Sequence, residues 1–280
     1  MKSSEHQEIQ TMTHAKEWLI ATSTPKLDAD TLKLYKSCGI DGIEISLPWN
    51  QYDQLDLPQT VRNAKEADIT ICSMHLPFSR EISIATLNAE HRAAAIAMQR
   101  RLIAYGAENG IHRFILHPSS EPIADEDRPQ AMQLAKEALA ELAEWADEHG
   151  SVICVEDLPR TCLGRTADEM LVLLSADERL RVCFDVNHLL TSNGSTHAEC
   201  IQKLGSRIVT LHLSDYDFID ERHFLPGNGL INWNEVITLL EEADYCGPFL
   251  YEVSHTNAPG PLDYAQLRKR QLVIKEYCGQ

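Results

Sequence analysis

Short apolar runs, separated by longer amphipathic stretches, recur along this chain and limit its fold more than any other feature. The runs have the length and apolar character of buried strands, and the stretches between them show helical periodicity, clearest at Ala89–Gly106 and Ala131–His149. Another helix is expected to begin near Trp233, with Asn232 as its cap. The predicted strands are Trp18–Thr22, Gly42–Leu47, Ile69–Leu76, Arg113–His117, Val152–Glu156, Val182–Asp185, Ile208–Leu213 and Phe249–Val253.

Buried strands that alternate with amphipathic helices favour a parallel sheet, because the helices cover the sheet and return the chain to the same edge. Eight such units in 280 residues average about 35 residues each, which favours a closed α/β barrel over an open sheet. No linker or change in composition marks a second domain. We therefore predict a single (β/α)8 TIM barrel over residues 17–280, preceded by a short polar extension at 1–16.

A polar residue stands at or near the C-terminal end of seven of the eight runs. In a (β/α)8 barrel these strand ends form one rim, so the side chains are expected to converge on a single mouth. Taken singly, such a histidine is more often a hydrogen-bonded structural residue than a ligand, and Glu44 is also explained by pairing with a neighbouring lysine or arginine. Their recurrence in successive units instead favours a metal or acid/base site. The seven residues are Glu44, His75, His117, Glu156, Asp185, His212 and Glu252.

The run at 182–185 ends in an acid, and a buried ionised carboxylate is costly unless a metal or a partner compensates it. The last four strands together supply three carboxylates and one imidazole. This donor set suits Mn, Mg or Co in near-octahedral geometry and also accepts Zn. Without an ion the carboxylates would repel one another. The sequence therefore predicts a divalent-metal site formed by Glu156, Asp185, His212 and Glu252.

Two further groups of polar residues are expected near the same mouth. His188 follows Asp185 by three residues and either contacts the substrate or supports a metal ligand from behind. A polar loop after the seventh strand carries Glu221, Arg222 and His223, which either face the site or are only solvated.

Composition restricts the partners and the cell compartment. The formal charge of −17 and the pI near 5.1 disfavour nucleic acid, because binding to phosphates depends on clustered Lys and Arg. The eight cysteines are scattered without a C-x-x-C pair, which predicts reduced packing residues. Neither a signal peptide nor a membrane helix is evident. We expect a soluble cytoplasmic protein that acts on a small molecule, and the sequence leaves a homo-oligomer open.

With these residues placed, the chain resembles the xylose isomerase-like barrel superfamily, which contains sugar and sugar-phosphate isomerases and epimerases together with endonuclease IV. The resemblance covers nearly the whole chain after the polar extension. It is specific for the superfamily and only weakly specific for the reaction. The matching segments are HLPF (75–78), LHPS (116–119), VEDLP (155–159), FDVNH (184–188), LHLSD (211–215), LPGNG with the following INW (225–233) and YEV (251–253).

The ketose 3-epimerases of this superfamily, such as D-tagatose 3-epimerase, hold one metal with four residues, two of which are glutamates that act as acid and base. The resemblance gives the acid/base roles to Glu156 and Glu252, working through an enediolate of the sugar. Asp185 and His212 would complete the metal shell. His188 stands at the position of a substrate-contacting histidine.

One position departs from the pattern of these epimerases. They commonly bind substrate with an arginine shortly after the histidine of the seventh strand, where this chain has Phe218. Arg222 is the candidate replacement. The sequence therefore identifies neither the sugar nor whether it is phosphorylated. A dehydratase or lyase that shares the proton abstraction stays open, as does a non-catalytic sugar-binding barrel, although both glutamates needed for catalysis are present.

The second function that the resemblance allows is phosphodiester hydrolysis by three zinc ions, as in endonuclease IV. That family adds ligands on strands three and four, after the Asp of strand six, and as an Asp-x-His pair in the loop after strand seven. Here only the Asp of that pair differs, because it is Glu221. The acidic charge and the lack of a basic DNA-gripping surface weigh against this reaction. The additional ligand positions are His75, His117, His188, Glu221 and His223.

Overall fold

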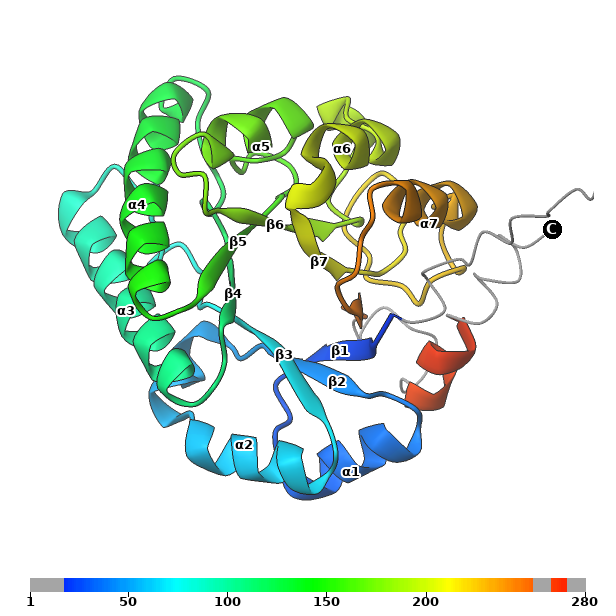
Figure 1. Ribbon diagram of the computed structural model, residues 1–280. Coiled ribbons are helices and arrows are strands. Elements are labelled where there is room, and N and C mark those ends of the chain that lie inside the picture. Colours follow the sequence, from blue (N-terminus) through cyan, green and yellow to red (C-terminus); the bar gives the residue numbers. More distant parts are fainter. Residues whose placement is uncertain (1–17, 254–262, 271–280) are drawn as a thin grey trace, which may run out of the picture.

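The computed structural model describes residues 18–253 and 263–270, which form a ring of parallel strands surrounded by helices (Figure 1). Consecutive strands pair from β1 to β7, and β8 pairs with β1. A parallel bridge between Leu213 and Tyr251 joins the chain beyond β7 to β8 and closes the ring. The predicted TIM barrel is confirmed. The strands are β1 (Ile20–Thr24), β2 (Gly42–Ile45), β3 (Thr70–His75), β4 (Arg113–Leu116), β5 (Val152–Glu156), β6 (Arg181–Asp185), β7 (Ile208–His212) and β8 (Phe249–Tyr251).

Local side chains explain where the helices begin. Six of the helices α1 to α7 follow an Asp, Asn or Thr whose side chain accepts a hydrogen bond from the first turn, and Asn232 does so for α7 as predicted. Helix α4 starts three residues before its predicted first residue, because Pro129 is favourable in a first turn. Residues 264–270 are also helical. The helices are α1 (Ala29–Ser37), α2 (Leu57–Glu66), α3 (Ala89–Glu108), α4 (Arg128–Glu148), α5 (Ala167–Leu174), α6 (His197–Leu204) and α7 (Trp233–Glu242), with 3-10 turns at Trp49–Gln54, Thr191–Asn193 and Gly205–Arg207.

The first strand differs most from its prediction, because it starts at Ile20 and not at Trp18. The Trp18 indole N–H donates to the carbonyl of Tyr245 at 2.9 Å, and its ring stacks on Phe249 with centroids 5.9 Å apart. Trp18 therefore packs as an apolar residue before the strand, which explains why its neighbourhood resembles a strand in sequence. The other strand bounds differ from prediction by at most two residues. The predicted extension at 1–16 lies outside the described residues.

Alternation along the strands separates an outer core from a small inner one. Phe114 and Phe184 belong to the large core that includes the buried residues of the helices. A second set fills the inside of the ring and consists of Ile115, Cys154 and Cys183. Two residues further along these strands stand His117, Glu156 and Asp185, so the site lies directly above an apolar layer. The predicted packing role is thereby confirmed for Cys154 and Cys183, whereas Cys72 on β3 is only partly buried.

The cysteines and the helices of the described residues can be compared with two further expectations. The seven cysteines that these residues contain are all free, as predicted from their spacing. None of the described helices combines the length with the apolar character that crossing a bilayer requires.

Arg128 at the start of α4 fixes the loop between β5 and α5, which borders the mouth. Its guanidinium donates to the carbonyls of Thr161 at 2.9 Å and Cys162 at 2.7 Å. It also pairs with Glu169 at 2.6 Å, and the two side chains are only 14% and 22% exposed. One side chain thus connects α4, this loop and α5.

We expect Arg128→Gln to lower the free energy of unfolding by roughly 2–4 kcal/mol, because it removes the charged donor that Glu169 and two carbonyls share and leaves Glu169 only Arg165, at 3.7 Å, as a charged partner among the described residues. Arg101→Gln is the matched control, since Arg101 pairs with Asp53 at the surface, where their side chains are 57% and 76% exposed. Its effect should stay within about 1 kcal/mol. Urea denaturation followed by circular dichroism measures both changes, and equal losses would contradict the assignment.

Candidate metal centre and active site

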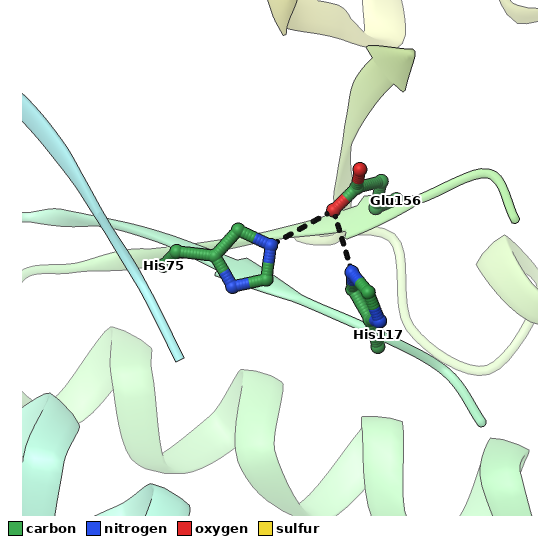
Figure 2. Close-up of side chains that lie close together, drawn as sticks. All are labelled: His75, His117 and Glu156. Atoms are coloured by element: carbon green, nitrogen blue, oxygen red, sulfur yellow. Dashed lines mark hydrogen bonds and ion pairs between the residues drawn. The ribbon is translucent and has the colours of Figure 1, made fainter. Parts of the chain in front are cut away.

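The strand ends bring the seven predicted rim residues into one connected polar cluster at the C-terminal mouth of the barrel. Glu156 occupies its centre, at the end of β5. Nε2 of His75 and Nε2 of His117 approach the same Glu156 oxygen at 3.1 and 3.0 Å, as Figure 2 shows. Nδ1 of His212 lies 2.9 Å from the other oxygen. A single buried carboxylate is therefore shared by imidazoles from β3, β7 and the residue that follows β4.

Four of these residues form a group that we call the principal group: Glu156, Asp185, His212 and Glu252. One ligand atom from each lies within 4.8 Å of the others. Besides its contact with Glu156, Nδ1 of His212 is 3.3 Å from Oε2 of Glu252. Oδ1 of Asp185 accepts the N–H of Asn187 at 2.7 Å, whereas Oδ2 is buried and makes no hydrogen bond of good geometry, although Nε2 of His188 lies 3.2 Å from it. A buried acceptor left without a donor is a ready ligand for a cation.

Hydrogen bonds to backbone carbonyls fix which ring nitrogen of His75 and of His188 faces the cluster. Nδ1 of His75 donates to the carbonyl of Leu76 at 2.8 Å, and Nδ1 of His188 donates to the carbonyl of Asp157 at 2.6 Å. In the neutral imidazole the proton is therefore held at Nδ1 and the lone pair lies on Nε2, which points into the mouth. This arrangement is typical of histidines that bind metals.

Glu44 lies in the cluster at the mouth, and among the described residues its partners are a histidine and a serine, not the lysine or arginine considered as the alternative. Its Oε1 accepts from Nε2 of His212 at 2.9 Å, and its Oε2 accepts from the hydroxyl of Ser73 at 2.7 Å. All three side chains are fully buried. Glu44 thus orients His212 from behind, so that Nδ1 of the imidazole faces the principal group.

Two further ligand groups flank the principal group. One consists of His75, His117 and Glu156. The other consists of His188, Glu221 and His223, and we call it the third group because it adjoins the other two. Nε2 of His188 lies 2.8 Å from Oε1 of Glu221 and 3.2 Å from Oδ2 of Asp185. The third group is therefore in contact with the principal group.

Arg222 and Phe218 are placed differently from the other candidates. The Arg222 guanidinium donates to Asp217 at 2.9 Å, within its own loop. Phe218 packs against His197 of α6, with ring centroids 5.8 Å apart. The backbone N–H of Arg222 also donates to the side chain of Asn187 at 3.4 Å, and the Phe218 carbonyl accepts from the N–H of Thr191 at 3.0 Å. The described contacts of these two side chains are thus with residues outside the ligand groups.

Two residues that sequence reasoning missed organise the site. Oδ1 of Asp157 accepts the backbone N–H of Asp185 at 2.7 Å, and burial raises the Asp157 pKa to about 7. Arg160 pairs with Glu221 at 2.5 Å. Burial opposes ionisation of Glu221, but His188 and Arg160 together lower its pKa to about 2. Asp157 could have been suspected as the acid directly after a predicted ligand, whereas nothing in the sequence singles out Arg160.

Burial and charge work against each other inside the mouth. Burial opposes ionisation of Glu156, but the imidazoles of His212 and His117 outweigh it and hold the pKa of this carboxyl well below its usual range. Burial raises the pKa of Asp185 well above its usual range. For His212 and His188, burial disfavours the imidazolium, yet the surrounding acidic groups raise both pKa values.

These observations fit a divalent cation in the principal group. Three carboxylates and one imidazole match the ligands that Mn, Mg and Co accept, and Zn accepts them as well. The acceptor on Asp185 that lacks a donor and the oriented lone pair of His212 face the same space. A cation there would also relieve the repulsion between the carboxylates of Glu156 and Glu252.

The chain belongs to the xylose isomerase-like TIM barrel family, whose pattern it matches over residues 32–274. An uncharacterized protein of Methanocaldococcus jannaschii is 28% identical over 220 residues, which are 76% of this chain and 73% of that protein. The inosose dehydratase of Histophilus somni is 28% identical over 167 residues, 52% of this chain and 55% of the dehydratase. The L-ribulose-5-phosphate 3-epimerase of Escherichia coli O157:H7 is 21% identical over 243 residues, 83% of this chain and 84% of the enzyme.

Solved structures of sugar epimerases share the fold. The D-psicose 3-epimerase of Clostridium cellulolyticum H10, solved with D-tagatose, superimposes with a TM-score of 0.75 at 18% identity, covering 92% of this chain and 97% of that one. A D-tagatose 3-epimerase-like protein gives a TM-score of 0.73 at 21% identity, covering 93% and 98%. The predicted relationship to this superfamily is confirmed, and at these identities the structural likeness concerns the fold.

Binding of a divalent ion to the mouth is expected to release protons near pH 7. The raised pKa values of His188 and His212 keep these imidazoles protonated above their ordinary range, and a protonated ring nitrogen cannot ligate. The release should shrink as the pH rises through the raised pKa values. Calorimetric titration with Mn²⁺ or Zn²⁺ in buffers of different ionisation enthalpy measures it. His91→Gln, at an exposed position, should leave the release unchanged, and a binding enthalpy independent of buffer would contradict the expectation.

Proposed function

We propose that this protein is a divalent-metal-dependent isomerase or epimerase of a sugar or sugar derivative. The observation that carries the proposal is the approach of two carboxylates to one imidazole nitrogen. Oε1 of Glu156 and Oε2 of Glu252 lie 2.9 and 3.3 Å from Nδ1 of His212. Family membership and relatives named as sugar epimerases support the substrate class.

The acid/base chemistry follows from the origin of the two glutamates. Glu156 ends β5 and Glu252 follows β8, so β6 and β7 separate their backbones in the ring and the two carboxylates come from different positions on the rim. In this proposal the sugar binds over them at the mouth. One carboxylate removes the proton beside the sugar carbonyl, giving an enediolate, and the other returns a proton to the opposite face or the neighbouring carbon. A divalent ion held by the principal group would polarise the sugar oxygens. Asp185 and His212 complete the ligand set, and His188 orients a substrate oxygen.

The two glutamates differ in their access to water. The Glu252 side chain is 27% exposed, whereas that of Glu156 is 2% exposed and surrounded by imidazoles. A proton on Glu252 should therefore exchange with solvent readily, while one on Glu156 is shielded. In this proposal Glu252 delivers a solvent-derived proton, and a proton taken by Glu156 can be retained.

We expect Glu156→Gln and Glu252→Gln each to lower turnover about 10²–10⁴-fold, because each removes one of the two proton-transfer groups. The assay is a panel of ketoses, their phosphates and keto-sugar derivatives in D₂O, with Mn, Mg, Co and Zn tested in turn. Deuterium should enter the product when Glu252 donates and be largely excluded when Glu156 donates. Glu141→Gln, on the exposed side of α4, is the control. Full turnover in either site variant would refute the acid/base assignment.

Product analysis in the same assay separates a related reaction. The similarity to inosose dehydratase makes loss of water after the first proton abstraction the main alternative outcome. Mass spectrometry distinguishes a dehydrated product from an isomer of unchanged mass.

A second candidate function, phosphodiester hydrolysis by three zinc ions, is favoured by the three adjoining ligand groups. These groups provide nine different side chains, which occupy the ligand positions that the resemblance to endonuclease IV implies. The formal charge of −17 opposes binding to DNA.

If the protein is a hydrolase, the purified protein should carry three tightly bound zinc ions per chain and should cleave DNA at abasic sites. We expect fewer tightly bound ions and no cleavage at any zinc loading. Metal analysis by plasma mass spectrometry and a cleavage assay with an abasic oligonucleotide measure the two properties. Cleavage that is lost in His223→Ala would replace the proposed isomerase with the hydrolase.

A further inference from the structure

Arg160 is the cation nearest to the third group and has an unusual backbone. It lies in the loop between β5 and α5 with φ 52°, in the left-handed region that side chains with a Cβ rarely adopt. Such a conformation persists only where the surrounding contacts hold it. The contacts of its guanidinium therefore indicate the role of the Arg160 side chain.

The guanidinium binds acids from two other loops. Nε donates to both oxygens of Glu121, in the loop after β4, at 2.9 and 3.0 Å. Nη1 donates to Asp220 at 2.8 Å, and Nη2 pairs with Oε2 of Glu221 at 2.5 Å, both in the loop after β7. The Arg160 side chain is 37% exposed, so these pairs lie at the edge of the mouth. Three loops over the site are thus joined by one positive charge.

Glu221 divides its two oxygens between Arg160 and the third group. Oε2 pairs with the guanidinium, while Oε1 lies 2.8 Å from Nε2 of His188. A carboxylate that already pairs with an arginine is a weaker ligand for a second cation. The guanidinium also repels any ion bound beside Glu221, and this repulsion is strong in a partly buried site.

The principal group has no such competitor among its described contacts. Glu156 and Glu252 pair with histidines, which can themselves ligate a metal ion. The arginine beside Glu221 has no lone pair with which to ligate and keeps its positive charge. The same cation would therefore bind to the two groups with very different affinities.

We propose that Arg160 is a resident cation that reserves Glu221 and weakens divalent-ion binding at the third group, so that the mouth holds fewer than three ions tightly. The inference rests on the proposed metal site, and it gives Arg160 a positioning role in selecting the chemistry of that site. It explains how a chain with all the side chains for a third ion can work with the principal group alone.

The test compares zinc binding to the full-length, metal-free protein and to Arg160→Gln, using equilibrium dialysis and plasma mass spectrometry. We expect affinity at the third group to rise at least about tenfold in Arg160→Gln, because the repulsion is removed and Glu221 is released. Arg160→Met, which keeps the apolar stem, is the second variant if the glutamine variant fails to fold. Arg179→Gln is the charge-matched control, since Arg179 pairs with Asp147 and Asp177 outside the loops described here.

Adding His223→Ala to the Arg160 variant should abolish the gain and so locate it at the third group. Co²⁺ absorption provides an independent reading of the number of sites. Three equally tight ions in the unmodified protein, or an unchanged or weaker third ion in the Arg160 variants, would overturn the inference while leaving the principal group intact. Absence of any ion from the principal group, tested with Glu156→Gln as reference, would overturn the proposed function together with the inference.

Discussion

The carboxylate of Glu156 is the charge on which the candidate site depends. It is buried at the centre of the mouth, where an unpaired carboxylate would be costly, and imidazoles approach both of its oxygens. Those imidazoles are held in turn, His75 by a backbone carbonyl and His212 by Glu44. Because the partners come from β2, β3, β5 and β7, the cluster requires the strands to meet in a ring. Closure of the barrel is thus a condition of the chemistry as well as of stability.

The principal group and the third group differ in what positions them. Glu156, Asp185 and His212 are the last residues of their strands, above the apolar layer inside the ring, so paired backbone fixes their direction. Glu221 and His223 belong to the loop after β7, which backbone bonds between Asp215 and Phe224 close at its base and side-chain contacts hold in between. Sites on strands hold their geometry more tightly than sites on loops. A change in loop contacts can therefore alter the third group while leaving the principal group as it is.

The strand-end residues could be predicted from sequence because two regularities coincide there. The barrel repeats a strand in every unit, and an acid or histidine after an apolar run is conspicuous since burying it is costly. The contacts between loops could not be predicted in this way. Arg160 finds Glu121 and Asp220 only through the tertiary arrangement of three loops, and no local pattern records it. The place of Glu44 at the rim could be predicted, but its partner could not, because His212 lies 168 residues away in the chain.

Backbone strain distinguishes the loops over the mouth from the rest of the described structure. Two of its non-glycine residues with positive φ, Asp68 and Asp244, follow the ends of α2 and α7, where a left-handed residue commonly ends a helix. The others, Arg160, Phe218 and His223, lie in the loops after β5 and β7. Positive φ angles that no helix end explains are maintained by tertiary contacts. Here Arg160 contacts Glu221 of the third group, and His223 of the same group contacts the backbone carbonyl of Glu252. The strand ends supply donors that either candidate reaction could use, so in the proposal made for Arg160 the charge and conformation of these loops select between an isomerase and a hydrolase.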